Sequence, residues 1–141
     1  MAAEIAAPET FFADRDERDW DRLLAYTETR RFRPGEVVLH AGIADRALYL
    51  LVDGRLEVVR AGARSALATV EAPATLGEAE FLDSRPRTVA LRALGHGEIE
   101  RLSWEAFEAL SAREPQLARD ILVDVGRVLA ARLRAGAGSL G

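Results

Sequence analysis

The segment Leu76–Ala93, LGEAEFLDSRPRTVALRA, decides the fold and holds most of the functional information in this sequence. It opens on a glycine and a carboxylate, Gly77-Glu78, and closes on an arginine and a hydroxyl, Arg87-Thr88. The residues between these pairs predict one short helical turn. A glycine lets backbone approach a ligand because it has no Cβ, and the first N–H groups of a helix point at anions. Since arginine binds phosphate oxygens through a planar charged fork, the segment favours a sugar phosphate.

The same residues also have a purely structural interpretation. Gly-Glu is a common dipeptide, and Arg87 could simply pair with an acid on the surface. The spacing from Gly77-Glu78 to Pro86-Arg87, between two strand-like segments, makes the binding interpretation the stronger of the two.

Short strand-like segments surround this stretch. Asp53-Gly54 is a strong hairpin signal between two of them. Strands that recur with a turn about every 8–12 residues are typical of a sandwich or a closed roll. The pattern predicts about eight short strands, and it marks residues 30–33, 36–40, 47–52, 55–60, 65–70, 88–93 and 98–102.

Helical patterns lie on both sides of the strands. Residues 14–26 have the apolar spacing of an amphipathic helix. After the strands, Ser103 is expected to cap a helix at its N-terminus. A broad apolar stripe over residues 117–133 predicts a further helix of about five turns.

On these residues, the segment 77–88 resembles the phosphate-binding cassette of the cyclic-nucleotide-binding domain. This family includes catabolite activator proteins, cyclic-nucleotide-dependent kinases and gated channels, and its pattern is roughly Gly-Glu, a few small or apolar residues, then Pro-Arg and small or hydroxyl residues. The resemblance implies a mainly β fold, a double-stranded β-helix jelly roll (β-roll) with one N-terminal helix and two C-terminal helices. We expect a flexible arm over residues 1–13, the domain over 14–134 and a flexible tail over 135–141.

The resemblance also implies roles for the residues that open the cassette. Gly77 would lie against the ribose phosphate, and the carboxylate of Glu78 would accept a hydrogen bond from the ribose 2′-hydroxyl. The backbone amides of Ala79 and Glu80 would donate to the phosphate from the start of the short helix.

At the other end of the cassette, Arg87 would pair with an exocyclic phosphate oxygen, and Thr88 would add a hydroxyl or an amide. A hydroxyl after the arginine often accompanies guanine tolerance in this family, so the expected ligand is cyclic AMP or cyclic GMP. Contacts to the purine are expected from residues 125–133, where no specific hydrogen bond to the base can be assigned. The arginines of this region are interpreted as solvated: Arg127, Arg132 and Arg134.

Glu80 departs from the family pattern, which usually has alanine or glycine at this position. A carboxylate within about 4 Å of a phosphate costs about 1 kcal/mol in water and about 4 kcal/mol at an effective dielectric constant of 20. Two orientations are open from the sequence. Glu80 can turn outward and pair with Arg85, or it can turn inward, in which case nucleotide affinity falls and a degenerate domain becomes one of the possible outcomes.

Two hypotheses for function follow. In the first, the chain is a regulatory module that relays the binding of a cyclic nucleotide to its C-terminal helices and to an effector that the sequence does not name. In the alternative, it is a ligand-free β-roll that serves as a dimerisation or interaction scaffold. The apolar stripe of the helix over residues 116–134 has two interpretations: it supports a homodimer or contacts a partner, or it packs on its own roll.

Composition excludes several other classes of protein. The chain has 141 residues, a net charge of −4, no cysteine and two histidines, and all 19 of its basic residues are arginine. The absence of cysteine excludes a thiolate metal site, and the absence of lysine excludes a Walker-type phosphate loop. We expect no enzyme activity, no metal and no cofactor. The acidic balance, and the absence of a helix-turn-helix and of a long apolar run, predict a cytoplasmic protein that binds neither nucleic acid nor membrane.

Overall fold

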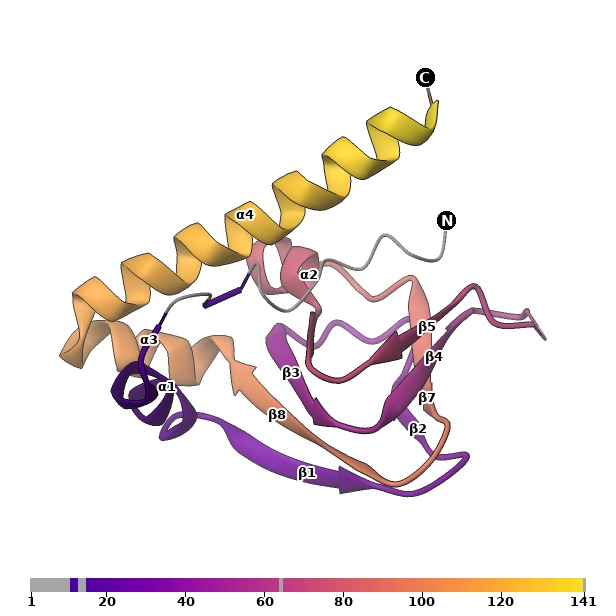
Figure 1. Ribbon diagram of the computed structural model, residues 1–141, viewed down its shortest axis with the longest axis horizontal. Helices are drawn as coiled ribbons and strands as arrows, with labels where there is room; N and C mark the ends of the chain where they lie inside the picture. Colours follow the sequence, from indigo (N-terminus) through magenta and orange to yellow (C-terminus); the bar gives the residue numbers. More distant parts are fainter. Residues whose placement is uncertain (1–10, 13–14, 64, 141) are drawn as a thin grey trace.

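The computed structural model describes residues 11–12, 15–63 and 65–140, with side chains described up to Gly136. Within these residues, strands form two sheets and helices lie outside them (Figure 1). The strands are β1 (Glu28–Phe32), β2 (Val37–Leu39), β3 (Ala47–Asp53), β4 (Arg55–Arg60), β5 (Ala68–Glu71), β6 (Ala74–Leu76), β7 (Val89–Ala93) and β8 (Gly97–Ser103). The helices are α1 (Glu17–Leu24), α2 (Glu78–Asp83), α3 (Trp104–Arg113) and α4 (Pro115–Leu140).

Each sheet has four antiparallel strands, in the orders β1-β8-β3-β6 and β2-β7-β4-β5. Strands that are distant in the sequence lie side by side, since β8 pairs with both β1 and β3 and β7 pairs with both β2 and β4. This interleaving is that of a roll rather than of a simple meander. The predicted jelly roll, with α1 before the strands and α3 and α4 after them, is confirmed.

Strand β3 shows how the layers are arranged. Leu48 and Leu50 face a cluster shared with the helices, whereas Tyr49 and Leu51 face a second cluster between the two sheets. Because both faces are covered, the first five residues of β3 are all buried and read as a continuous apolar run. The sheet that contains β3 is therefore the middle layer, with the other sheet on one side and the helices on the other.

Two elements differ from the sequence-based expectation. Strand β6 was not predicted, because three consecutive buried residues, 74–76, carry no alternating pattern. Helix α4 continues to Leu140, so the tail expected over residues 135–141 is helical up to that point. Alanine alternates with glycine there, and the high helix propensity of alanine offsets the cost of glycine.

The N-terminal arm expected over residues 1–13 lies outside the described residues except for Phe11 and Phe12. These two side chains are buried, and both rings contact Trp20 at centroid distances of 6.3 and 5.0 Å. The amide of Phe12 also donates to Oδ2 of Asp124 on α4, at 3.2 Å. The expectation of a loose arm is wrong at these two residues, because two aromatic side chains bury a large apolar area.

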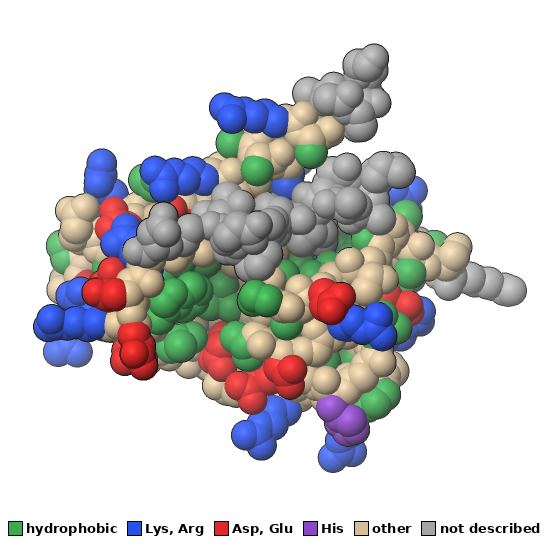
Figure 2. All heavy atoms as spheres, in the orientation of Figure 1, with side chains coloured by type: hydrophobic (Ala, Val, Ile, Leu, Met, Phe, Trp, Pro, Cys, Tyr) green, Lys and Arg blue, Asp and Glu red, His purple; other side chains and the backbone are tan. Residues whose placement is uncertain are grey.

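Charges of both signs share the surface. On the face drawn in Figure 2, arginine side chains lie close to acidic ones along the rim. Ion pairs tie elements together at the surface, for example Arg15 to Asp120 at 2.6 Å and Arg101 to Glu28 at 2.9 Å. None of the helices in the described part of the chain combines the length and the apolar character that a membrane crossing requires.

Candidate functional site

The turn between β6 and α2 depends on Gly77. This residue has φ +80° and is the N-terminal cap of α2, without any side-chain hydrogen bond to the helix. A Cβ at this position would lie 2.9 Å from the carbonyl oxygen of Ala47 and 3.0 Å from Nη1 of Arg87. Only glycine fits both this backbone conformation and this close approach. The first N–H groups of α2, which have no partner within the helix, therefore start directly beside the Arg87 guanidinium.

Helix α2 has only six residues, and contacts outside it hold it in place. The ring of Phe81 is fully buried and packs edge-on against Trp104 and Phe107, at centroid distances of 5.1 and 5.4 Å. Arg46 lies over the Trp104 ring at 3.5 Å and donates to the carbonyl oxygens of Phe81 and Leu82, at 2.8 and 3.2 Å. These bonds satisfy carbonyls that a helix end otherwise leaves without partners.

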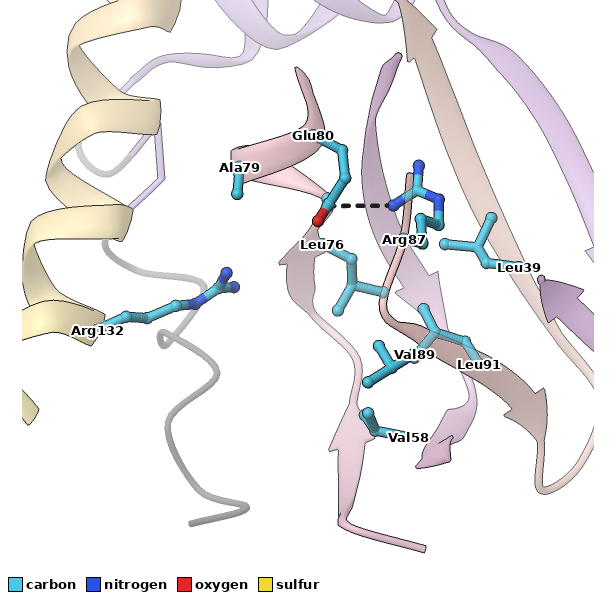
Figure 3. Close-up of a pocket in the computed structure, with 10 residues that line it drawn as sticks. Leu39, Val58, Leu76, Ala79, Glu80, Arg87, Val89, Leu91 and Arg132 are labelled. Atoms are coloured by element: carbon cyan, nitrogen blue, oxygen red, sulfur yellow. Dashed lines mark hydrogen bonds and ion pairs between the residues drawn. The ribbon is translucent and has the colours of Figure 1, made fainter. Parts of the chain in front are cut away.

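A pocket of about 170 Å³ opens beside α2 (Figure 3). Its walls combine an apolar floor with three charged side chains and the start of α2. The lining residues are Leu39, Val58, Leu76, Gly77, Ala79, Glu80, Arg87, Val89, Leu91 and Arg132. This volume is below the roughly 300–1,000 Å³ of typical small-molecule sites, and part of the space is taken up by side chains of the chain itself.

Arg87 is the charged centre of this pocket and is only 6% exposed. Its Nη2 donates to the carbonyl oxygen of Asp45 at 3.0 Å, and its Nη1 contacts Oε1 of Glu80 at 3.4 Å. Its Nε has no hydrogen-bond partner. The backbone of Arg87 is fixed as well, because its N–H donates to Ile43 and its carbonyl accepts from Gly42. The guanidinium is thus held in a defined position with one side toward the pocket.

A polar network behind Arg87 fixes Asp45. The Asp45 carboxylate accepts hydrogen bonds from Nη2 of Arg101, at 2.7 Å, and from the hydroxyl of Tyr49. Burial alone would raise the pKa of Asp45, but these bonds and the charges of Arg101 and Arg87 hold it below its ordinary value. Burial and the Asp45 carboxylate raise the pKa of Tyr49. The Asp45 carboxylate is therefore charged at neutral pH, with one oxygen 3.7 Å from Nη2 of Arg87.

Glu78 is fully buried next to the pocket and faces α4. Its Oε1 accepts a hydrogen bond from Nη1 of Arg132 at 2.8 Å, and its Oε2 has no partner. Arg132 also donates from Nη2 to the carbonyl oxygen of Thr75 at 3.3 Å. Figure 3 shows the Arg132 side chain reaching from α4 toward the pocket. The last helix is therefore tied to the first residue of α2 by a buried ion pair.

The structure brings together most of the predicted site residues. Gly77, Ala79, Glu80 and Arg87 line the pocket, and Glu78 is buried beside it. Thr88 is exposed and does not line the pocket. Of the two orientations considered for Glu80, the structure has the inward one, with the carboxylate at Arg87 rather than at Arg85.

Sequence reasoning missed three side chains of the site: Asp45, Arg46 and Arg132. The interpretation of Arg132 as a solvated residue is wrong, because its guanidinium contacts Glu78. A signal for it did exist, since position 132 continues the spacing of the buried residues Ile121, Val125 and Val128 on α4. No comparable signal distinguishes Asp45 or Arg46 from other loop residues.

Several buried polar atoms in and beside this pocket lack hydrogen-bond partners. They are Oε2 of Glu78, Nε of Arg87, Nε of Arg132 and Oγ1 of Thr75. Such atoms are costly in a protein interior, and native structures contain few of them. Their concentration around one pocket is typical of a site at which a polar ligand supplies the missing bonds.

Comparison with known proteins identifies the family. A family model described as the cyclic nucleotide-binding domain matches residues 29–114, which include β1 to β8 and α2. The chain belongs to this family. The cyclic nucleotide-binding domain from Methylobacillus flagellatus superposes with a TM-score of 0.79 at 25% identity, over 94% of this chain and 78% of that one. The catabolite activator protein of Thermus thermophilus gives a TM-score of 0.77 at 26% identity, over 95% of this chain and 62% of that one.

Curated relatives include a bacterial receptor and fungal enzymes. The cyclic AMP receptor protein of Thermus thermophilus is 29% identical over 81% of this chain and 52% of its own length. Lysophospholipase nte1 of Neurospora crassa is 29% identical over 72% of this chain, but over only 7% of its own length. The chain thus spans about half of the receptor and a small part of the enzyme.

Replacing Gly77 with alanine tests the geometry of this turn, with Gly42→Ala as the matched control. Both glycines have a φ near +80°, but a Cβ at Gly42 would meet no atom within 4 Å. The backbone strain of alanine at such a φ, about 1–2 kcal/mol, is therefore common to both variants. We expect Gly77→Ala to lower the free energy of unfolding by about 1–3 kcal/mol more than Gly42→Ala, because its Cβ overlaps Ala47 and Arg87. Equal losses in urea denaturation would contradict the close approach.

Proposed function

We propose that this chain is a regulatory module that binds a cyclic nucleoside monophosphate. The observation that carries the proposal is the almost fully buried guanidinium of Arg87 at the wall of an apolar pocket, beside the glycine turn that opens α2. A buried charge requires a counter-charge, and an anionic ligand that displaces Glu80 would supply it from the pocket side. Membership of the cyclic nucleotide-binding family and the likeness to a cyclic AMP receptor support a cyclic nucleotide as that anion.

The pocket offers a partner for each part of such a ligand. In this proposal Arg87 and the first amides of α2 bind the phosphate, and Glu78 accepts a hydrogen bond from the ribose 2′-hydroxyl. The apolar lining, with Leu39, Val58 and Leu91 among its residues, contacts the carbon surfaces of the sugar and the base. Tolerance of cyclic GMP would depend on a hydroxyl from Thr88 in the pocket. Because Thr88 is exposed, we place cyclic AMP first.

Calorimetric titration with cyclic AMP tests the function, with Arg87→Ala as the test variant and Arg85→Ala as its control. Arg85 lies in the same loop but is exposed, and its backbone N–H donates to Oδ1 of Asp83 at 2.9 Å. A hydrogen bond to a charged group contributes about 1.5–3 kcal/mol, so we expect Arg87→Ala to weaken binding by about 10- to 150-fold and Arg85→Ala to leave it unchanged. Equal affinities of wild type and Arg87→Ala would overturn the assigned role.

The alternative of a ligand-free scaffold also has an observation in its favour, because Glu80 occupies the side of Arg87 that faces the pocket. The same titration separates the two functions. If millimolar cyclic AMP produces neither heat nor a thermal shift with the folded wild-type chain, the scaffold is the better account.

We further propose that binding is relayed through the ion pair between Glu78 and Arg132. A ribose hydroxyl that donates to the unpartnered Oε2 of Glu78 draws this carboxylate toward the ligand and so competes with Nη1 of Arg132 for its position. Loss of this bond frees α4 from the end of the pocket, since Arg132 lies beyond Val128, the last buried apolar residue among the side chains of α4 that the structure describes. A ligand shifts the position of α4 only to the extent that it favours one arrangement, and this competition supplies such a preference.

Amide hydrogen exchange on α4 tests the relay. We expect saturating cyclic AMP to speed exchange in residues 128–136 of the wild type. Arg132→Ala should show faster exchange there without ligand and a smaller further change with ligand. Arg134→Ala, which removes an exposed arginine two positions along, should behave as the wild type. Identical exchange of the wild type with and without bound nucleotide would contradict the relay.

The expected homodimer through residues 116–134 remains a proposal, supported by the surface of α4. Leu122, Gly126, Leu129 and Leu133 recur at intervals of four, three and four residues, which is the spacing of a coiled-coil seam. Leu133 is 74% exposed, although it is a large apolar side chain. Pairing of two such helices would cover this seam.

Light scattering on the wild type, on Leu133→Glu and on Ala131→Glu tests the dimer. Ala131 is exposed on the same helix but lies off the seam. We expect the wild type and Ala131→Glu at twice the mass of the 15.4 kDa chain, and Leu133→Glu at the mass of the monomer. A wild type that stays monomeric at its highest soluble concentration would exclude pairing through this seam.

A further inference from the structure

We propose that Glu80 is a built-in competitor for the ligand phosphate, which holds Arg87 in the free protein and sets how tightly an anion can bind there. This inference rests on the proposed function, since it assigns a determinant of affinity to the same pocket.

The contact between the two side chains places the Glu80 carboxylate where an anion would bind. Glu80 reaches from the third position of α2 into the pocket, and its Oε1 lies 3.4 Å from Nη1 of Arg87 (Figure 3). The other terminal nitrogen, Nη2, already donates to the carbonyl oxygen of Asp45 at 3.0 Å. Nη1 and the unpartnered Nε are therefore the nitrogens that an incoming oxyanion would use, and Glu80 occupies Nη1.

The difference in burial between Arg87 and Glu80 makes Glu80 an effective competitor for an anionic ligand. The Arg87 side chain is 6% exposed, whereas that of Glu80 is 24% exposed. The buried guanidinium of Arg87 needs a counter-charge because it is removed from water. The Glu80 carboxylate is partly exposed, so it can be hydrated again when it moves away from Arg87. The ion pair is therefore stable without a ligand and can be broken by one. An anion that displaces Glu80 must also tolerate the displaced carboxylate nearby, because both would carry negative charge.

Glu80 has no evident part in holding the scaffold of the site. Helix α2 is anchored by the buried ring of Phe81 and by the hydrogen bonds of Arg46, and the turn before it by Gly77. Arg87 keeps its bond to Asp45 and its backbone bonds whatever the position of Glu80. Removal of the Glu80 carboxylate therefore leaves the binding groups in place and only frees Nη1.

The energetic consequence is a lower apparent affinity. When only a fraction of the protein has Arg87 free, the apparent Kd rises in inverse proportion to that fraction. A domain with Glu80 responds to a cyclic nucleotide only at a higher concentration than the same domain with a small neutral residue at this position.

Calorimetric titration of cyclic AMP into the full chain tests this, with Glu80→Gln and Glu80→Ala as test variants. Glu108→Gln is the matched control, because it removes one negative charge from an exposed position on α3. We expect the two Glu80 variants to bind cyclic AMP at least about tenfold more tightly than the wild type, and Glu108→Gln to bind as the wild type does. Thermal unfolding establishes that each variant is folded.

A double variant distinguishes a local effect from a general effect of charge. In an Arg87→Ala background, Glu80→Gln should bring no gain in affinity, because the competition acts through that guanidinium. Equal Kd values for the wild type and Glu80→Gln would overturn the inference and leave the proposed function standing. Absence of binding by all folded variants would overturn both. Binding by Glu80→Gln but not by the wild type would support the inference, with Glu80 as the residue that closes the site, and would overturn the proposed function of the natural chain.

Discussion

The site depends on the burial of one charged group, the guanidinium of Arg87, which is almost completely removed from solvent. A charge in such a place must be neutralised and hydrogen-bonded, and the surrounding chain is arranged to do so. Asp45 binds one terminal nitrogen from behind and Glu80 contacts the other from the pocket. Gly77 leaves the space that the guanidinium requires. The site is therefore built around the Arg87 guanidinium, and its partner on the pocket side, the Glu80 carboxylate, can be replaced by another anion.

The layered fold explains how this arrangement reaches the helices. The middle sheet carries Leu50 toward the helices and Tyr49 toward the cluster between the sheets, where the Arg87 guanidinium lies over its ring at 5.1 Å, so one strand contributes to both regions. Helix α2 lies between them, with Glu80 at the pocket and Phe81 in the helical cluster. The buried ion pair of Glu78 with Arg132 adds a direct link to α4. A change in what occupies the pocket thus acts on groups that already contact the last helix.

The sequence predicts the roll and the opening of the cassette because these depend on local signals. Such signals involve only residues close together in the sequence. They are the turn glycines, the alternating pattern of the strands, and the Gly-Glu and Pro-Arg pairs. Strand β6 and the buried positions of Phe11 and Phe12 escape such signals, because tertiary packing alone determines them. The orientation of Glu80 was open for the same reason: its choice of Arg87 over Arg85 depends on which guanidinium the fold buries.

A crystal structure of the chain grown with cyclic AMP tests the central claim most directly, because it shows which anion holds Arg87. The account predicts a phosphate oxygen within hydrogen-bond distance of Nη1, with the Glu80 carboxylate moved away and the bond between Arg132 and Glu78 broken. A structure in which cyclic AMP is bound elsewhere, or in which Glu80 keeps its contact with Arg87 while the pocket excludes the nucleotide, would contradict it.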